Sequence, residues 1–270
     1  MSNDEIIPIW QPLGFSTHQI AKKSSEKFGK KGTHTGTLDP LAEGVIILLL
    51  GDTRLKKIEL AGWKKTYEFE IAFGVSTDSF DAMGYFSDID LAKPRVDGTA
   101  LREITSSLRG PYVQSVPIYS AVKFMGKRLF EYAHGGNIPQ DLPTKSGEIY
   151  ELDYLGCREV VVKEAVTEII SKIRSIEGQF RQENILNQWE NYFRTLTGAE
   201  NFSVAKFRVV ISRGMYVRAL SQDICSRLES PGFVYSLVRT QNGNYTRKDC
   251  VTLDDIFGKN FDRSLLVSHF

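Results

Sequence analysis

The stretch TYEFEIAF, residues 66–73, constrains the fold more than any other part of the chain, because its side chains alternate strictly in character. Large apolar residues fall on one side and smaller or acidic ones on the other: Tyr67, Phe69, Ile71 and Phe73 against Glu68, Glu70 and Ala72. A period of two residues with one apolar face is typical of a β-strand that packs that face on a core. We therefore expect a half-buried strand here, within a sheet.

Strand and helix patterns are mixed along the rest of the chain. Strand patterns occur at 148–155, 204–212 and, more briefly, 85–90; helix patterns occur at 17–28, 97–108, 161–195 and 217–228. The glycine-rich residues 29–36 are expected to form a loop, and residues 233–239 suit either a short helix or a strand. The predicted fold class is α+β, with a central, mainly antiparallel mixed sheet flanked by helices and loops.

Composition and length exclude several classes of protein. Of the 270 residues, 41% are hydrophobic and 25% are charged, which excludes a disordered or fibrous chain. The length fits one large domain or two small ones. The first residues are acidic rather than basic, and the longest apolar run, Val45 to Leu50, is far below the roughly 20 residues that cross a bilayer. We therefore expect a cytoplasmic chain with no membrane partner.

Neither a disulfide scaffold nor a metal site is expected. The three cysteines, Cys157, Cys225 and Cys250, are odd in number, far apart and without a CxxC pair. Reduced thiols in a cytosolic setting explain them most simply. The histidines are scattered, without a cluster of cysteine and carboxylate ligands around them: His18, His34, His134 and His269. No Walker-type phosphate loop is present in the sequence.

Charge is distributed unevenly although the net charge is only +1. Residues 18–31 carry five lysines against one glutamate, and residues 202–247 carry seven basic side chains against two acidic ones. Residues 159–200, in contrast, have five bases and seven acids. On charge alone, the two basic segments fit solvated surface or phosphate contacts with a nucleic acid equally well.

The segment KKGTHTGTLDPLA, residues 30–42, contains a lone carboxylate, Asp39, among glycines, threonines and lysines. Pro40 has a fixed φ and pushes Asp39 toward extended geometry, which restricts the direction of the carboxylate. Gly32 and Gly36 allow the backbone to approach a bulky ligand. The structural alternative is that Asp39 forms an Asx-turn or caps a helix whose first residue is Pro40.

Residues 32–46, GTHTGTLDPLAEGVI, resemble the motif II segment of the TruB-type pseudouridine synthases, the tRNA pseudouridine-55 synthases. Further segments similar to that family occur in the family's order over residues 11–247. They are QPLGFST (11–17), GDTRL (51–55), KTY (65–67), TDSFDAMG (77–84), QSVPIYSAVK (114–123), GKR (126–128), SRGMYVRAL (212–220) and LVRT (237–240). Because so many segments keep one order, the chain is identified by resemblance as a member of this family.

The resemblance implies a pseudouridine-synthase fold and an isomerase that needs neither cofactor nor metal. The expected reaction converts a uridine, at position 55 in the T loop of tRNA, to pseudouridine, with the base flipped out of the RNA. Asp39 would be the catalytic aspartate, Arg218 would pair with it, and Tyr67 would stack on the target base. From local sequence alone, Arg218 fits a phosphate contact or a solvated site as well, and Tyr67 fits an ordinary core aromatic.

Substrate-binding positions are implied in the same way. His34 would fill the space left by the flipped base, and the alternative is a loop histidine bonded to backbone. Leu237 would line an apolar pocket or simply belong to the core. The remaining substrate-binding positions are Lys31, Thr37, Tyr119, Lys123 and Arg239, of which Lys123 and Arg239 would either face the substrate or support the pocket. The two basic segments would contact phosphates of the tRNA arm.

The sequence departs from the family pattern in several places. Thr33 stands where glycine is usual, Gln11 where lysine is common and Glu68 where a base is common, changes expected to stiffen a loop or weaken phosphate binding. Residues 158–203 form an insert longer than the usual link, expected to be a helical surface hairpin or an RNA contact. We expect one catalytic domain over residues 1–270, no C-terminal PUA domain, and a monomer.

Two other functions stay open at this point. A guide-RNA-dependent pseudouridine synthase acting on ribosomal RNA would share the catalytic fold, but such enzymes depend on a PUA domain to bind the guide RNA. A non-catalytic RNA-binding or RNA-folding protein would not need Asp39, Tyr67 and Arg218, all of which are present.

Overall fold

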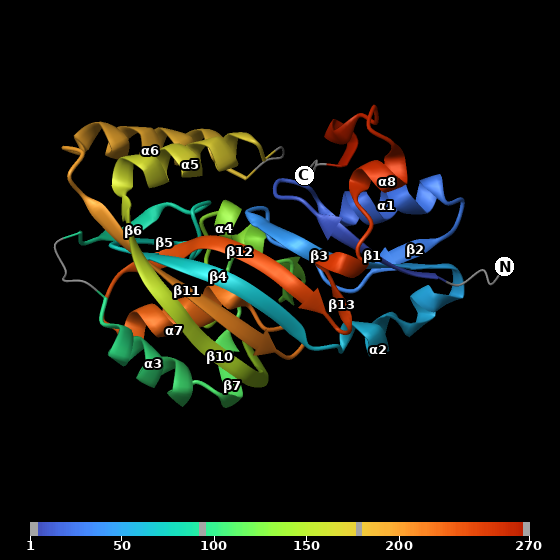
Figure 1. Ribbon diagram of the computed structural model, residues 1–270, viewed down its shortest axis with the longest axis horizontal. Helices are drawn as coiled ribbons and strands as arrows, with labels where there is room; N and C mark the ends of the chain where they lie inside the picture. The colour runs from blue at the N-terminus through green and yellow to red at the C-terminus, as the bar shows by residue number, and fades with distance from the viewer. Residues whose placement is uncertain (1–4, 92–95, 177–179, 267–270) are drawn as a thin grey trace.

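A nine-stranded sheet forms the centre of the computed structural model, which describes residues 5–91, 96–176 and 180–266 (Figure 1). The strands in spatial order are β1 (Glu5–Gln11), β3 (Ala42–Leu50), β12 (Gly232–Asn242), β4 (Lys65–Phe73), β11 (Asn201–Ile211), β10 (Thr144–Val161) and β7 (Gly110–Ser115), with β2 (Gly32–His34) beside β3 and β13 (Tyr245–Thr246) beside β12. Neighbours are antiparallel except β3 and β12, which run parallel. The predicted α+β fold with a mainly antiparallel mixed sheet is confirmed.

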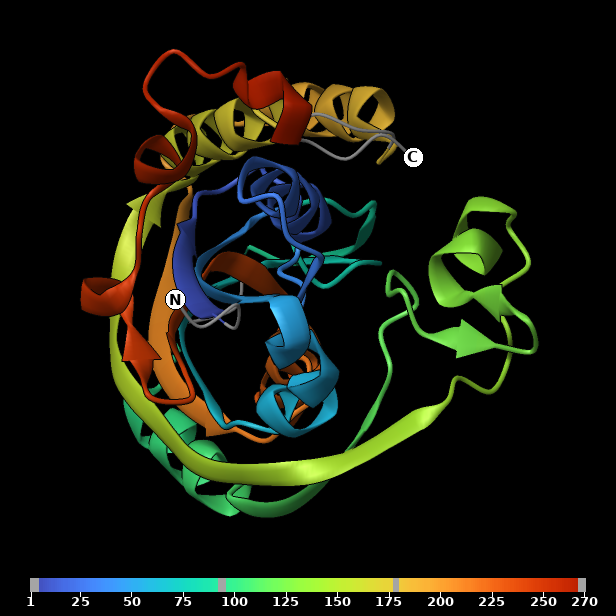
Figure 2. The same ribbon diagram turned by 90° about the vertical axis from the view of Figure 1, so that its right-hand side faces the viewer.

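Helices cover the sheet on both faces (Figure 1). They are α1 (Thr17–Lys27), α2 (Lys57–Ala61), α3 (Gly98–Ser107), α4 (Leu129–His134), α5 (Val162–Arg174), α6 (Gln182–Thr195), α7 (Val217–Arg227) and α8 (Leu253–Phe257), with 3-10 turns η1 (Gly51–Lys56), η2 (Arg247–Asp249) and η3 (Arg263–Leu266). Two strand pairs lie outside the main sheet: β5 (Val75–Thr77) with β6 (Phe86–Ile89), and β8 (Lys123–Phe124) with β9 (Lys127–Arg128). Figure 2 shows β10 sweeping round the curved sheet and the β8–β9–α4 unit standing apart from it.

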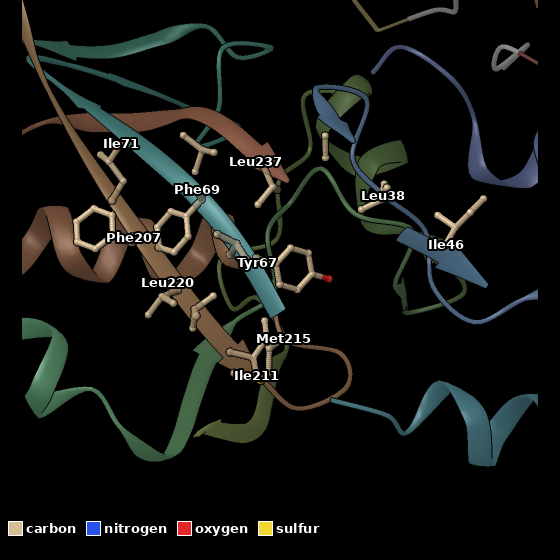
Figure 3. Packing of buried hydrophobic residues seen from close by; sticks show 14 of the residues in the cluster. Leu38, Ile46, Tyr67, Phe69, Ile71, Phe207, Ile211, Met215, Leu220 and Leu237 are labelled. Carbon is tan, nitrogen blue, oxygen red and sulfur yellow. The ribbon is translucent and has the colours of Figure 1, made fainter. Parts of the chain in front are cut away.

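The apolar face of β4 packs into the main core, as its alternation predicts. Tyr67, Phe69 and Ile71 lie in one buried cluster with Leu220 of α7, and the Phe69 ring stacks on Phe207 with centroids 5.1 Å apart (Figure 3). The strand is central in the sheet and more buried than the half-buried strand expected, since seven of its nine residues are buried. The two exceptions are Glu68 and Glu70 on the second face, which are partly exposed and pair with Lys206 of β11 and Arg158 of β10.

Those two glutamates account for one departure from the family pattern. Glu68 pairs with Lys206 at 2.6 Å, and Glu70 pairs with Arg158. The first pair joins β4 to its neighbour β11, and the second reaches past β11 to β10. Glu68 therefore has a structural role in the sheet as the partner of Lys206, and its expected effect on phosphate binding stays a prediction.

Several predicted boundaries are wrong for tertiary reasons. The expected loop at 29–36 contains strand β2, because Gly32–His34 pairs with the edge of β3. Strand β10 extends well beyond the predicted 148–155, since two register shifts interrupt its alternation. For residues 233–239, the strand alternative is the one present, within β12.

The insert predicted at 158–203 is helical only in its middle. Its first residues complete β10 and its last residues begin β11, and α5 and α6 lie between them as a hairpin. The apolar stripe of this hairpin packs on the second face of the sheet, with Trp189 fully buried beside Phe202 and Phe233. The hairpin is therefore part of a second hydrophobic core rather than a surface appendage. None of the helices in the described ranges is both long and apolar enough to cross a membrane.

Trp189→Ala tests whether this second core stabilises the whole fold. Trp189 is 0% exposed, and its indole N–H donates to the Ala82 carbonyl at 3.0 Å. Truncation leaves a cavity and an unpaired carbonyl, so the free energy of unfolding should fall by about 3–5 kcal/mol. Urea denaturation followed by circular dichroism measures it. Leu186→Ala, at a partly exposed site on the same helix, should cost clearly less; equal losses would contradict the proposed packing.

Candidate active site

The side chains of Asp39 and Arg218 form a two-bond ion pair between segments far apart in the sequence. Arg218 Nε donates to Asp39 Oδ2 at 2.9 Å, and Arg218 Nη2 donates to Asp39 Oδ1 at 2.8 Å. Arg218 is only 3% exposed, whereas the Asp39 side chain is 31% exposed. The paired geometry predicted from the resemblance is therefore present, with the carboxylate at the surface end and the guanidinium beneath it.

Two backbone carbonyls fix the orientation of the Arg218 guanidinium. Arg218 Nη1 donates to Ser79 O at 2.9 Å, and Arg218 Nη2 donates to Tyr119 O at 3.1 Å. Burial lowers the pKa of Arg218, but the adjacent carboxylates of Asp39 and Asp81 outweigh that effect, so the pKa rises above its usual range. Arg218 therefore stays charged and is held in one plane.

Asp81 is a second carboxylate near the same guanidinium, with Oδ2 3.7 Å from Arg218 Nε. It is buried, and burial raises its pKa, although the charge of Arg218 and bonds from Ser79 Oγ (2.6 Å) and Met83 N (2.9 Å) act in the opposite direction. Asp81 belongs to the family-like segment 77–84, but the resemblance alone assigned no role to it. An acidic residue within a matched motif of turn residues is the sequence feature that could have identified it.

A turn, and not a helix, follows Asp39. The Ala42 N–H donates to the Asp39 carbonyl at 2.9 Å, and β3 begins there, so the alternative of a helix cap with Pro40 at the first position is wrong. Two contacts hold this turn from the N-terminal segment: Gly14 N donates to Pro40 O at 3.2 Å, and Leu38 N donates to Thr17 Oγ1 at 3.1 Å. The Asp39 side chain is thereby free to bond Arg218.

Gln11 supports the segment around Phe15 and Thr17 through hydrogen bonds that the sequence did not predict. It is fully buried, its Oε1 accepts the Thr17 hydroxyl at 2.6 Å, and its Nε2 donates to Phe15 O at 2.7 Å. Because Thr17 in turn accepts the Leu38 N–H, Gln11 stabilises the loop before Asp39. The expectation that Gln11 weakens phosphate contacts is wrong, since a fully buried side chain does not face the phosphates of an RNA.

A small pocket that is open to solvent lies beside the ion pair. Both members of the pair line it, together with Leu41, Ala42, Asp81, Val234, Tyr235, Ser236 and Leu237. Leu237 lines the pocket, as the resemblance implies, and it also belongs to the main hydrophobic core, with only 7% of its surface exposed. A mostly apolar wall with one oriented carboxylate suits a flat, weakly polar group such as a nucleobase or the sugar attached to it.

Tyr67 and Arg239 lie on adjacent strands near this pocket. Arg239 is 1% exposed, and its N–H groups bond Val45 O at 2.7 Å and Gly36 O at 3.1 Å, with Tyr67 Oη at 3.5 Å. Figure 3 shows the Tyr67 ring below Leu237, with the hydroxyl on the side of the cluster away from Phe69. Arg239 thus ties the Gly36 loop to β3 and Tyr67 and is too buried to contact phosphates directly.

His34 lies on β2 with its Nδ1 buried and without a hydrogen-bond partner among the described residues. Burial, assisted by the cations Lys57, His18 and Arg239, lowers the pKa of His34 to about 4. The His18 ring lies 6.5 Å away, centroid to centroid. His34 Nδ1 therefore makes no hydrogen bond to the backbone of the described residues. With its pKa lowered to about 4, the ring is neutral at physiological pH.

The other predicted positions lie apart from the pocket lining. Tyr119 donates its hydroxyl to Asp78 Oδ2 at 2.6 Å, so it supports the site through its backbone carbonyl and through that carboxylate. Lys31, Thr37 and Lys123 are exposed, and Lys123 belongs to the small β8–β9 hairpin. None of these three lines the pocket beside the ion pair.

The basic segment 202–247 does not form one cationic surface. Lys206 and Arg208 are paired with strand carboxylates, and Arg218 and Arg239 are buried. In the segment 18–31, Lys22, Lys27 and Lys31 are exposed on or beside α1, whereas Lys23 and Lys30 are paired with glutamates. Across the described ranges, no set of three or more histidine, cysteine, aspartate or glutamate side chains is arranged to hold a metal ion.

His34→Gln tests the burial of this histidine through the pH dependence of stability. With a folded pKa of about 4 against 6.5 unfolded, only the unfolded chain binds the proton between these values. Wild-type stability should therefore fall as the pH drops from 6.5 to 4, with His34 contributing about 3 kcal/mol at most. Urea denaturation at pH 7 and pH 5 should show a smaller loss in His34→Gln. The exposed His134→Gln is the control, and an unchanged pH profile in both variants would contradict the assignment.

The chain is similar in sequence to a known protein family and to several of its members. Residues 23–172 match the family described as TruB family pseudouridylate synthase (N terminal domain). The tRNA pseudouridine synthase B of Geobacillus kaustophilus (strain HTA426) is 36% identical over 258 residues, which are 94% of this chain and 76% of that protein. The tRNA pseudouridine synthase B of Geobacillus thermodenitrificans (strain NG80-2) is 34% identical over 255 residues, 94% of this chain and 72% of that protein.

A solved structure shares the fold at much lower sequence identity. The "Crystal Structure of a Cbf5-Nop10-Gar1 Complex" contains a chain that superposes with a TM-score of 0.56 and 17% identity. The match covers 93% of this chain and 52% of that one, so this chain spans about half the length of its structural neighbour.

Proposed function

The chain belongs to the TruB family of pseudouridylate synthases, which are isomerases, and we propose that it converts the uridine at position 55 in the T loop of tRNA to pseudouridine. The observation that carries the proposal is a partly exposed carboxylate, Asp39, oriented by the buried Arg218 at the mouth of a mostly apolar pocket. The tRNA substrate is supported by the names of the relatives, which cover most of this chain.

The proposed reaction breaks the bond between uracil N1 and the sugar C1′ and joins C1′ to C5 of the turned base. N1 gains a proton and C5 releases one, so no oxidant, reductant or phosphate donor is needed. Of the two carboxylates near Arg218, Asp39 is open to solvent and Asp81 is buried. A carboxylate can serve as nucleophile or accept a proton from the sugar. Its two oxygens are already fixed in direction by Arg218, which limits the reorganisation that the reaction requires.

The surrounding side chains support extrusion of the base in this proposal. Unstacking a base costs a few kcal/mol, which contacts within the pocket and a wedge in the RNA can offset. Tyr67 and Leu237 would contact the flipped uracil, and His34, held neutral, would occupy the space it leaves. The exposed lysines of 18–31 would then bind phosphates of the tRNA arm.

Asp39→Asn should abolish turnover while RNA binding stays within about threefold of wild type, because the amide cannot act as nucleophile or base. Tritium release from tRNA transcript labelled at uridine C5 measures turnover, and filter binding measures affinity. Glu43→Gln, four residues along the same segment, should retain activity. Intact activity in Asp39→Asn would remove the carboxylate from the mechanism, and an RNA-folding activity unaffected by this change would point to the non-catalytic alternative.

Arg218→Lys should lower kcat by about 100-fold or more and leave RNA binding nearly unchanged. Lysine keeps the charge but loses the planar two-bond contact, so Asp39 would no longer be held in one orientation. Single-turnover tritium release gives the rate, and thermal melting checks that the variant folds. Arg227→Lys on the same helix is the control. Comparable losses of binding and rate would mean that Arg218 contacts the RNA instead of orienting Asp39.

A further inference from the structure

The hairpin α5–α6 contacts both chain segments that hold the Asp39–Arg218 pair. On the Asp39 side, Ser175, directly after α5, lies so close to Gly14 that a Cβ on Gly14 would be 3.1 Å from the Ser175 carbonyl oxygen. The Gly14 N–H in turn donates to the carbonyl of Pro40. The hairpin therefore lies against the segment that supports the turn after Asp39.

On the other side of the pair, α6 binds the loop of residues 77–86. Trp189 Nε1 donates to Ala82 O at 3.0 Å, and the Phe86 N–H donates to Gln188 Oε1 at 3.0 Å. This loop carries the Ser79 carbonyl, which accepts a hydrogen bond from Arg218, and the buried Asp81 carboxylate, which lies 3.7 Å from Arg218 Nε. One segment therefore lies between the hairpin and each member of the proposed catalytic pair. Next to Asp39 it is the segment of Gly14, and next to Arg218 it is the loop that carries Ser79 and Asp81.

Arg181, immediately before α6, contacts Asp78, Tyr119 and Tyr85. Its Nη1 lies 3.3 Å from Asp78 Oδ2, and its guanidinium lies 4.3 Å from the Tyr119 ring centroid and 4.6 Å from that of Tyr85. The side chain is 20% exposed. Arg181 has a φ of 63°, a left-handed conformation that a non-glycine residue keeps only where its surroundings determine it.

Asp78 connects Arg181 to the two carbonyls that orient Arg218. Its Oδ2 accepts the Tyr119 hydroxyl at 2.6 Å, and its Oδ1 accepts the Tyr85 N–H at 2.8 Å. Tyr119 supplies one of the Arg218 carbonyl partners, and Ser79, the residue after Asp78, supplies the other. A change at Asp78 would therefore be transmitted to both partners of the Arg218 guanidinium.

We propose that Arg181, a residue of the insert, is a positioning residue for the isomerisation, acting through Asp78 and Tyr119 on Arg218. The inference rests on the proposed function. Its guanidinium balances the Asp78 charge and stacks on the two tyrosine rings, which fixes the loop ends that carry the Arg218 partners. Loss of Arg181 frees these ends, so Arg218 presents Asp39 less accurately while the surface lysines that bind RNA are untouched.

Arg181→Ala should lower kcat for tritium release by about tenfold and leave KM and RNA binding within twofold of wild type. The matched control is Arg174→Ala: Arg174 belongs to the same hairpin and is also ion-paired, to Glu190 at 2.6 Å, but it contacts neither Asp78 nor Tyr119. Arg174→Ala should keep wild-type kcat. Equal kcat in Arg181→Ala and Arg174→Ala would overturn the proposal, and so would a loss confined to KM.

Arg181→Lys separates positioning from general folding. Lysine keeps the charge next to Asp78 but lacks a plane to stack on Tyr119 and Tyr85. It should restore part of the lost kcat, to about threefold below wild type, with a melting temperature no different from that of Arg181→Ala. If kcat instead follows the melting temperature across all three variants, the role of Arg181 is structural only and the proposal fails.

A second measurement decides the matter without any turnover. The Nε–Hε proton of Arg218, bonded to Asp39, gives an arginine side-chain signal in ¹⁵N-labelled protein, assigned by its change in Asp39→Asn. This signal should shift or exchange faster with water in Arg181→Ala and stay in place in Arg174→Ala. If wild type turns over no tRNA, the proposed function fails, yet the signal still shows whether Arg181 positions Arg218. An unmoved signal in Arg181→Ala would overturn the inference.

Discussion

The guanidinium of Arg218 is almost completely removed from water, and a charge in that position is costly unless every part of it is paired. Its partners come from three other segments, at Asp39, Ser79 and Tyr119. Leaving any of these unmade would expose the buried charge to an apolar surrounding, so the loops that supply them have little freedom to move independently. The same requirement makes Asp39 a carboxylate of fixed direction at the end of an otherwise flexible, glycine-containing segment. Stability and orientation at this site therefore come from one interaction.

A second buried guanidinium organises the neighbouring strands. Arg239 bonds carbonyls of Val45 and Gly36, and its own backbone pairs with Gly44 where β3 and β12 run parallel. A Cβ on Gly44 would lie 2.3 Å from the Arg239 carbonyl oxygen, so only glycine allows the two strands to come this close. The close parallel contact brings the segment after Asp39 beside Leu237, and so the two halves of the pocket wall are joined through backbone.

Local pattern was enough to predict the elements whose neighbours do not alter them. The alternation at 66–73 and the helix at 217–228 are both present, and the order of family motifs placed Asp39 and Arg218 together. What local pattern missed depends on partners distant in sequence. Strand β2 forms because it pairs with β3, and Ala72 on the second face of β4 is buried because it lies in the core that α5 and α6 cover. Gln11 carries no motif that marks a residue supporting a loop, and Arg181 lies outside the segments that resemble the family. Gln11 acts through the contact of Thr17 with the distant Leu38, and Arg181 contacts the distant Asp78, so sequence patterns did not identify either one.

The two ends of the helical insert are hydrogen-bonded neighbours. Val161 of β10 pairs with Asn201 of β11, and the Val162 N–H donates to the Glu200 carbonyl. The segment between them is thus a long loop at the tip of an antiparallel strand pair, and a chain could gain or lose such a loop without shifting the register of a single strand. Removing this segment would nevertheless have a cost, because Phe202 and Phe233 beneath it are fully buried and would then face water. An insertion that began as neutral to the sheet can in this way become indispensable, once the side chains below it have become apolar.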